Sequence, residues 1–229
     1  MPLSTTKPAD DAAPVKKRRG RPPASAEELQ AAHGAARDRI CGAALTLFDR
    51  GGIDAISMRE IAGVIGASPM MPYKYFPTKD HLLQELRSRA FLQFEAALRS
   101  AVDGPDTART KLEQMLVAYL EFGLRERRAY RLMFDYWVYD SPSRMFEDFG
   151  DAIRRQSGAW NVVLEVVEAY FAETGESGDP MTAAHLIWAS LHGLVSLEAS
   201  RKLVMGRDFR ELIAPMVAAI MSGVAPANR

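Results

Sequence analysis

The sequence predicts an all-α protein. Apolar residues recur every three or four positions along most of the 229 residues, which is the spacing of the buried face of a helix, and no segment of useful length alternates as a β-strand does. Two Ser-x-x-Glu segments mark helix starts, and Gly and Pro residues separate the apolar segments. Hydrophobic residues make up 48% of the chain, which is enough for the core of one large domain or of two modest ones.

The expected helices follow one another with short separators. Residues 1–24 have no periodicity and are rich in Pro, Ala, Thr and charge, so we expect this segment to be disordered. Ser25 and Glu28 form a capping box that begins the first helix, which Gly34 could interrupt. Further helices are expected at 36–50, 57–65, 68–74, 78–102, 106–126, 127–138, 143–173, 181–204 and 208–222.

The segment 57–79 predicts a helix-turn-helix. Ser57 and Glu60 form the second capping box, and an apolar stripe follows at helical spacing. Gly66 can adopt the left-handed backbone that ends a helix, Ser68 can cap the next one, and Pro69 suits its first position. A short helix, a Gly turn and a second short helix form the motif whose second helix enters the major groove of DNA.

Three segments in and around this motif resemble the tetracycline-repressor-like (TetR) family of transcription regulators. They read AALTLFDRGG, SMREIAGVIGAS and YKYFPTKDHLL, in the order and at the spacing of the family, and the resemblance covers residues 36–96. It implies a DNA-binding domain at 25–96 and a helical domain at 97–229 that binds a small effector and forms a dimer. It also implies a regulator, more often a repressor, that the effector releases from a palindromic operator.

Several residues of the motif are candidates for DNA contact. By resemblance, Tyr73, Tyr75 and Lys79 fall where family members hold phosphates, and Arg59 falls where some members reach a base edge. Arginine can bond guanine O6 and N7 together, so Arg59 is the best candidate for reading a base, although an ordinary surface arginine is the alternative. Ser57 can offer its hydroxyl or a helix-start N–H to a phosphate. The expected contacts within the motif are Ser57, Met58, Arg59, Ser68, Pro69, Met70, Met71, Tyr73, Lys74, Tyr75 and Lys79.

The chain departs from the family at two places in the second helix. Pro72 replaces the usual aliphatic residue, and an interior proline removes a helix hydrogen bond, so the recognition helix could be shorter or tighter. Met70 and Met71 replace smaller or polar residues, and they either touch thymine methyl groups or simply pack. Phe76 is expected in the core of the helix junction.

A basic segment precedes the motif. Its Arg-Gly-Arg-Pro core resembles an AT-hook, in which Gly20 would let the backbone approach the minor groove while Arg19 and Arg21 enter its negative potential. A solvated basic tail is the alternative. Residues 1–90 carry 14 Lys and Arg against 10 Asp and Glu, and residues 91–229 carry 15 against 19. This asymmetry suits a chain whose amino-terminal end meets nucleic acid.

Bulky residues at helical spacing in the second domain could line an effector cavity. A filled helical core is the alternative for every one of them. The candidates for contact with an apolar or amphipathic ligand are Met115, Tyr119, Phe122, Met133, Phe134, Trp137 and Trp160. The candidates for a four-helix dimer seam, which include small residues that allow close helix approach, are Ala189, Ser190, Gly193, Leu197, Leu212, Met216, Val217 and Ile220.

Other classes of protein find little support in the sequence. The single cysteine, Cys41, excludes an intrachain disulfide, and we expect it to be packed in the core. His185 and His192 share a helix face but lack further metal ligands, so we expect no metal. With no convincing catalytic set, phosphate loop, signal peptide or apolar run of about 20 residues, we expect no enzyme, no cofactor and no membrane partner. We expect a cytoplasmic, nucleoid-associated protein; an architectural DNA-binding protein without an effector remains the alternative.

Overall fold

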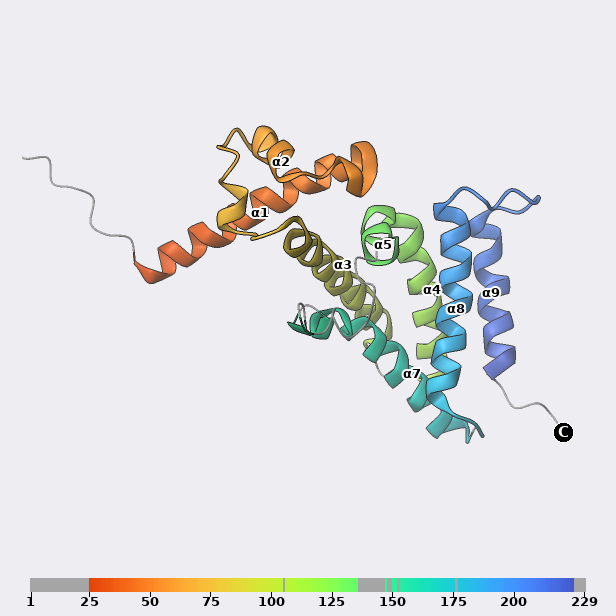
Figure 1. Cartoon of the computed structure of the whole chain (residues 1–229). Coiled ribbons are helices and arrows are strands. Elements are labelled where there is room, and N and C mark those ends of the chain that lie inside the picture. Colours follow the sequence, from red (N-terminus) through yellow and green to blue (C-terminus); the bar gives the residue numbers. More distant parts are fainter. Residues whose placement is uncertain are drawn as a thin grey trace, which may run out of the picture.

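The computed structural model describes residues 25–104, 106–135, 147, 150–151, 153–175 and 177–224. Every regular element in these ranges is helical, which confirms the all-α fold (Figure 1). The amino-terminal head contains α1 (Ala26–Gly51), η1 (Gly52–Ala55), α2 (Met58–Ile65) and η2 (Pro72–Lys74). The second domain contains α4 (Ala108–Arg125), α5 (Arg127–Phe134), α7 (Gly158–Thr174), α8 (Pro180–Ala199) and α9 (Phe209–Val224), and α3 (Lys79–Val102) belongs to both.

Helix α1 is longer than the sequence suggested. Ser25 and Glu28 form the expected capping box, but the helix then runs through Gly34 without a break. The expectation that Gly34 interrupts it was therefore wrong. A glycine inside a helix costs only about 1 kcal/mol, and the carboxyl-terminal half of α1 recovers this by burying Ile40, Leu47 and other apolar residues.

The expected recognition helix at 68–74 is not an α-helix. Helix α2 ends, as expected, at Gly66, whose φ of 67° is left-handed, and the chain then turns into the short 3₁₀ element η2. The N–H groups of Met71, Lys74 and Tyr75 donate to carbonyls three residues earlier, as in 3₁₀ rather than α geometry. Pro72 has no N–H to donate toward Ser68, so it prevents regular α-helical bonding through this segment.

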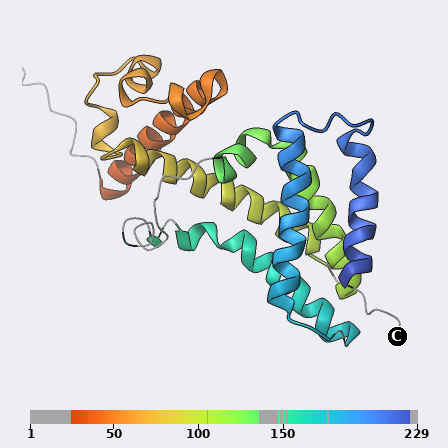
Figure 2. The ribbon, with the colours of Figure 1, turned by 45° about the vertical axis from the view of Figure 1, so that its right-hand side comes forward.

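Helix α3 runs from the head into the second domain, where it packs against α4, α5 and α7 (Figure 2). Helices α8 and α9 pack on α4 at the far side of the second domain (Figures 1 and 2). Side chains from both domains join one continuous core, including Leu83, Leu98 and Leu116. Helices α4 and α8 approach closely at Gly123, where an added Cβ would overlap the side chain of Val195.

Candidate nucleic-acid interface and ligand cavity

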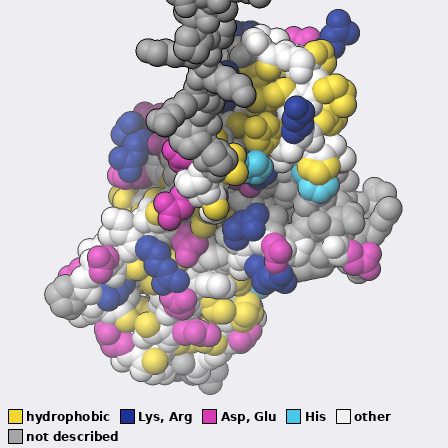
Figure 3. Space-filling model, turned by 90° about the vertical axis from the view of Figure 1, so that its left-hand side faces the viewer, with side chains coloured by type: hydrophobic (Ala, Val, Ile, Leu, Met, Phe, Trp, Pro, Cys, Tyr) yellow, Lys and Arg dark blue, Asp and Glu magenta, His cyan; other side chains and the backbone are white. Residues whose placement is uncertain are grey.

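The turn that replaces the recognition helix presents one face to solvent. Ser68, Pro69, Met70, Tyr73 and Lys74 are exposed, and they project from the side of the turn opposite the core. The exposed fraction is 45% for Tyr73 and 66% for Met70. Arg59, at the first turn of α2, is also exposed. Hydrophobic and basic side chains lie together on the upper part of the molecule, at the height of α1 and α2 (Figure 3).

Arg37 of α1 fixes the turn from behind. Its Nη1 donates to the carbonyl of Tyr75 at 3.0 Å, and its Nη2 bonds Glu85 of α3 at 3.0 Å. The guanidinium also lies 4.2 Å from the ring centre of Phe76. His33 adds a ring contact at 5.0 Å to Tyr75. Burial raises the pKa of the Glu85 carboxyl, but hydrogen bonds and charge from Arg89 and Arg37 outweigh it, so the net shift is downward.

Phe76 is 1% exposed and lies in the core, as expected. Arg37 was not among the expected site residues, although a basic residue on the otherwise apolar side of α1 was a signal that could have identified it.

Four other expected DNA contacts are less accessible than the sequence suggested. Met58 is 4% exposed and packs in the core, so its inclusion was wrong: the first turn of α2 turns this side chain inward. Met71 and Tyr75 are half-buried and pack against the core. The Lys79 ammonium donates to the carbonyl of Ile53 at 2.8 Å, which commits one of its three N–H groups to holding η1.

The remaining expected contacts are Ser57 and the basic arm. The Ser57 hydroxyl accepts from the N–H of Glu60 at 3.1 Å, as an N-cap does. Arg19 and Arg21 lie outside the described residues. The head itself carries no excess charge, since residues 25–90 contain eight basic and eight acidic side chains. The positive balance of residues 1–90 therefore resides in residues 1–24, which hold six basic and two acidic side chains.

A cavity of about 540 Å³ lies in the second domain between α3, α4, α5, α7 and α8. Four of the expected ligand contacts line it, namely Tyr119, Met133, Phe134 and Trp160. Met115 and Phe122 do not line the cavity and are buried in the core instead. For these two residues the alternative of a filled helical core is therefore correct. Trp137 lies outside the described residues. The cavity is also lined by residues that were not expected as ligand contacts, namely Arg87, Phe91, Phe94, Gln156, Ala159, Val163, His185, Trp188 and His192.

Two residues that line this cavity, Tyr119 and His192, belong to a chain of hydrogen bonds. The hydroxyls of Tyr119 and Tyr130 lie 3.2 Å apart, the Tyr130 hydroxyl lies 2.7 Å from Nδ1 of His192, and Nε2 of His192 lies 3.2 Å from Oγ of Ser196. Each hydroxyl of the chain can both donate and accept, and a neutral His192 donates from one ring nitrogen and accepts at the other, so every member can be satisfied at once.

Burial determines the protonation of these groups. It raises the pKa of both the Tyr119 and the Tyr130 hydroxyl, so the two phenols stay neutral. Burial also lowers the pKa of His192, which favours the neutral imidazole. The chain therefore joins α4, α5 and α8 through fixed, uncharged polar contacts beside an otherwise aromatic cavity.

Other polar side chains at the cavity are held by neighbouring groups. The Gln156 amide donates to Gln84 Oε1 at 3.1 Å and to Ser88 Oγ at 3.2 Å. His185 Nδ1 lies 2.8 Å from the carbonyl of Met181, and Arg87 Nη2 donates to the carbonyl of Met133 at 3.0 Å. The cavity thus combines ring-bearing walls with a few oriented polar groups, the usual make-up of a small-molecule site.

Helix α5 touches both the cavity and the head. On one side, Met133 and Phe134 line the cavity. On the other, Arg128 forms an ion pair with Asp49 of α1 at 2.9 Å, and the Arg131 guanidinium lies 5.1 Å from the ring centre of Phe48. A displacement of α5 by a molecule in the cavity would therefore act directly on the end of α1.

The outer face of α8 is exposed where the dimer seam was expected. Ala189, Ser190 and Gly193 are exposed there, and so is Leu197, whose accessible fraction is 43%. Leu212, Met216 and Val217 of α9 are half-buried, whereas Ile220 is 9% exposed and packs into the chain's own core. For Ile220 the monomer-core alternative is therefore correct.

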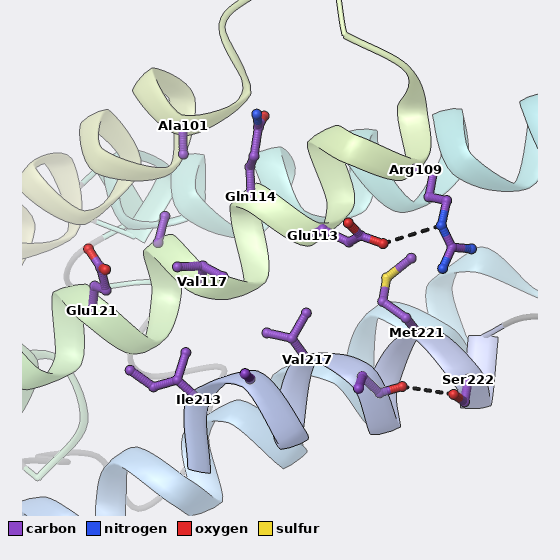
Figure 4. Close-up of a pocket in the computed structure, with 13 residues that line it drawn as sticks. Ala101, Arg109, Glu113, Gln114, Val117, Glu121, Ile213, Val217, Met221 and Ser222 are labelled. Atoms are coloured by element: carbon purple, nitrogen blue, oxygen red, sulfur yellow. Dashed lines mark hydrogen bonds and ion pairs between the residues drawn. The ribbon is translucent and has the colours of Figure 1, made fainter. Parts of the chain in front are cut away.

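Helix α9 also borders two surface grooves. The groove between α8 and α9 has a volume of about 290 Å³. The groove between α4 and α9 has a volume of about 870 Å³; Val117, Ile213 and Val217 line it, and an Arg109–Glu113 ion pair at 3.2 Å lies at one end (Figure 4). Both grooves are separate from the 540 Å³ cavity lined by aromatic rings, called the ring-lined cavity below, because they share no lining residue with it.

Family models match both parts of the chain. Residues 40–86 match the model described as bacterial regulatory proteins of the tetR family, and residues 112–220 match the model of the tetracyclin repressor-like C-terminal domain. The chain belongs to the TetR family. Within the ranges that the structure describes, no group of three His, Cys, Asp or Glu side chains could hold a metal ion, and no helix is long and apolar enough to cross a membrane.

Relatives within the TetR family are transcriptional regulators. The repressor KstR of Mycolicibacterium smegmatis is 32% identical over 144 residues, which cover 63% of this chain and 65% of the relative. KstR of Mycobacterium tuberculosis is 38% identical over 69 residues, or 30% of this chain and 31% of the relative. The matched region thus spans less than two thirds of each of these curated relatives.

Solved structures show the same fold over nearly their whole length. A tetR-family regulatory protein from Rhodococcus RHA1 is 25% identical, with a TM-score of 0.63 over 84% of this chain and 98% of the other. The regulator FadR of Bacillus subtilis, solved in complex with stearoyl-CoA, is 16% identical, with a TM-score of 0.66 over 82% of this chain and 99% of the other.

Proposed function

We propose that this protein is a sequence-specific DNA-binding transcriptional regulator, and that it represses transcription until a small molecule enters the ring-lined cavity and releases it from its operator. The observation that carries this proposal is the double contact of α5, which lines the cavity with Met133 and Phe134 and holds the head through Arg128 and Arg131. Two sites joined by one short helix are what ligand-controlled DNA binding requires.

The proposed DNA contacts divide into two kinds. The exposed Arg59 reads a base edge, and Tyr73, Lys74 and the remaining N–H groups of Lys79 bond phosphates. Ser57 and the helix start contribute a further phosphate contact. Arg19 and Arg21 enter the adjacent minor groove, and their segment supplies most of the net positive charge, since the head is balanced.

The proposed ligand is apolar or amphipathic. Aromatic side chains dominate the cavity wall, and only a few oriented polar groups reach it. The relative FadR, which has the same fold, was solved with the amphipathic stearoyl-CoA. The proposed mechanism is a shift of population: a ligand that fits better when α5 and α3 are displaced lowers operator affinity by the difference in its binding energy between the two arrangements.

The regulator acts as a homodimer on a palindromic operator. The exposed small and apolar residues of α8, namely Ala189, Ser190, Gly193 and Leu197, form the seam together with Leu212, Met216 and Val217 of α9. A symmetric pair of heads would read two half-sites spaced by about one helical turn of DNA. Light scattering at micromolar concentration should give twice the monomer mass, and a monomer mass would refute the seam.

Selection of genomic fragments bound by the full-length protein tests the function. A recurring symmetric motif is expected, and enrichment of A·T-rich DNA without a palindrome would instead indicate an architectural protein. The variant Arg59→Ala should lose roughly 1–3 kcal/mol of binding free energy on the selected motif. Its binding to random DNA should change much less, and an equal loss on both would contradict base reading.

The ligand step is tested on the same motif. Stearoyl-CoA and other apolar or amphipathic compounds are titrated while the fluorescence of Trp160 and Trp188 and the operator affinity are followed. A compound that quenches the tryptophans should weaken operator binding, and the variant Arg131→Met should keep the quenching while reducing the effect on DNA. Quenching by every binder without any change in operator affinity would refute the coupling.

A further inference from the structure

The turn at residues 67–75, called the recognition turn below, exposes the large apolar side chain of Met70. Met70 keeps 66% of its surface accessible, whereas its neighbour Met71 is half-buried and packs against the core. The backbone here is not free to turn Met70 inward. The N–H of Met71 donates to the carbonyl of Ser68 at 2.9 Å, and Arg37 holds the far end of the turn at Tyr75.

The other exposed side chains of α2 and of the turn have a consistent chemistry. Val64 of α2 and Tyr73 of the turn are also exposed, to 46% and 45%. The basic side chains of Arg59 and Lys74 are exposed on the same two elements. Apolar atoms accompanied by cations match the major groove of DNA, where phosphates border a groove whose floor carries one apolar group, the C5-methyl of thymine.

We propose that Met70 is a specificity-determining residue that selects thymine in each half-site by covering its C5-methyl group. The inference rests on the proposed function, because it requires this face of the head to enter the major groove. An unbranched methionine can adjust its three torsions to the methyl group without demanding one rotamer.

The size of the effect follows from the area involved. Burying one methyl group contributes about 0.8 kcal/mol. Since about 1.4 kcal/mol corresponds to a tenfold change in affinity, loss of the thymine methyl should weaken binding roughly fourfold for each half-site. Hydrogen bonds to the same base pair would be unaffected, because uracil differs from thymine only at C5.

The experiment uses the full chain and a random duplex pool. The enriched motif is resynthesised with deoxyuridine in place of thymidine, one position at a time, and affinities are measured by fluorescence anisotropy. Wild-type protein should lose roughly fourfold at one thymine position of the half-site. Met70→Ala should bind the thymine and uracil duplexes equally at that position.

Met205→Ala is the matched control, because this methionine is 91% exposed on the loop between α8 and α9, away from the head. It should keep the full difference between thymine and uracil, and circular dichroism checks that both variants are folded. An enriched motif that is indifferent to uracil at every position, or a penalty that persists in Met70→Ala, overturns the inference alone. A pool with no enriched sequence overturns the proposed function itself.

Discussion

Replacing Tyr130 by phenylalanine removes one oxygen atom from the hydrogen-bonded chain at the cavity. Tyr130 is 2% exposed, and its hydroxyl lies between the hydroxyl of Tyr119 and Nδ1 of His192. The substitution leaves one buried polar group on Tyr119 and one on His192 without this partner. Each such group costs about 1–3 kcal/mol, so we expect the free energy of unfolding to fall by about 2–6 kcal/mol.

Thermal unfolding followed by circular dichroism measures this loss, with all proteins at one concentration because dimerisation also raises stability. For a protein of this size the Tm should fall by roughly 4–24 °C. Tyr73→Phe is the matched control: Tyr73 is 45% exposed, and its loss should change stability by less than about 0.5 kcal/mol. If Tyr130→Phe melts within about 2 °C of the wild type, the hydrogen-bonded chain does not stabilise the second domain.

Three further predictions concern pH, charge and packing. Burial lowers the pKa of His192 below its ordinary 6.5, so the contribution of His192 to stability is complete above pH 6.5 and declines as the pH falls. The Tm difference between wild type and His192→Gln should therefore shrink on acidification, and a difference that stays constant would contradict this. Deleting residues 1–24 removes six basic side chains. In anisotropy titrations, the slope of log affinity against log salt concentration should become shallower by about 2–5. An unchanged slope would show that residues 1–24 make no contact with DNA phosphates. Gly123→Ala should destabilise the fold by about 1–3 kcal/mol, because the added Cβ meets the side chain of Val195. In Gly193→Ala the added Cβ meets no described atom within 4 Å. This second variant should leave the fold intact and weaken only dimerisation.

Local signals in the sequence were sufficient for most of the helices. The capping residues Ser25 and Ser57 and the left-handed Gly66 lie where their side chains or backbone preferences predicted. The prediction of a break at Gly34 was wrong, because the low helix propensity of one glycine costs less free energy than the burial of a whole helix face contributes. Pro72 indicated that the second helix would be shortened, but its effect is larger, since the segment adopts 3₁₀ geometry.

The sites were harder to predict than the helices. Helical periodicity says that Met115 and Tyr119 face inward together, but only the packing of five helices decides that Tyr119 borders a cavity and Met115 does not. Gln156 gave no signal at all, because its role depends on Gln84 and Ser88, which are about 70 residues away in the chain. Contacts of such sequence separation cannot be read from local patterns.

The length of α3 has a mechanical consequence. Its 24 residues form a rod of about 36 Å that begins beside the recognition turn and ends in the second domain. Pivoting such a rod by about five degrees carries its far end through roughly 3 Å, close to the rise of a single base step. For the proposed function, a molecule in the cavity would need only a slight tilt of α3 to shift the head against the bases of DNA by about one step.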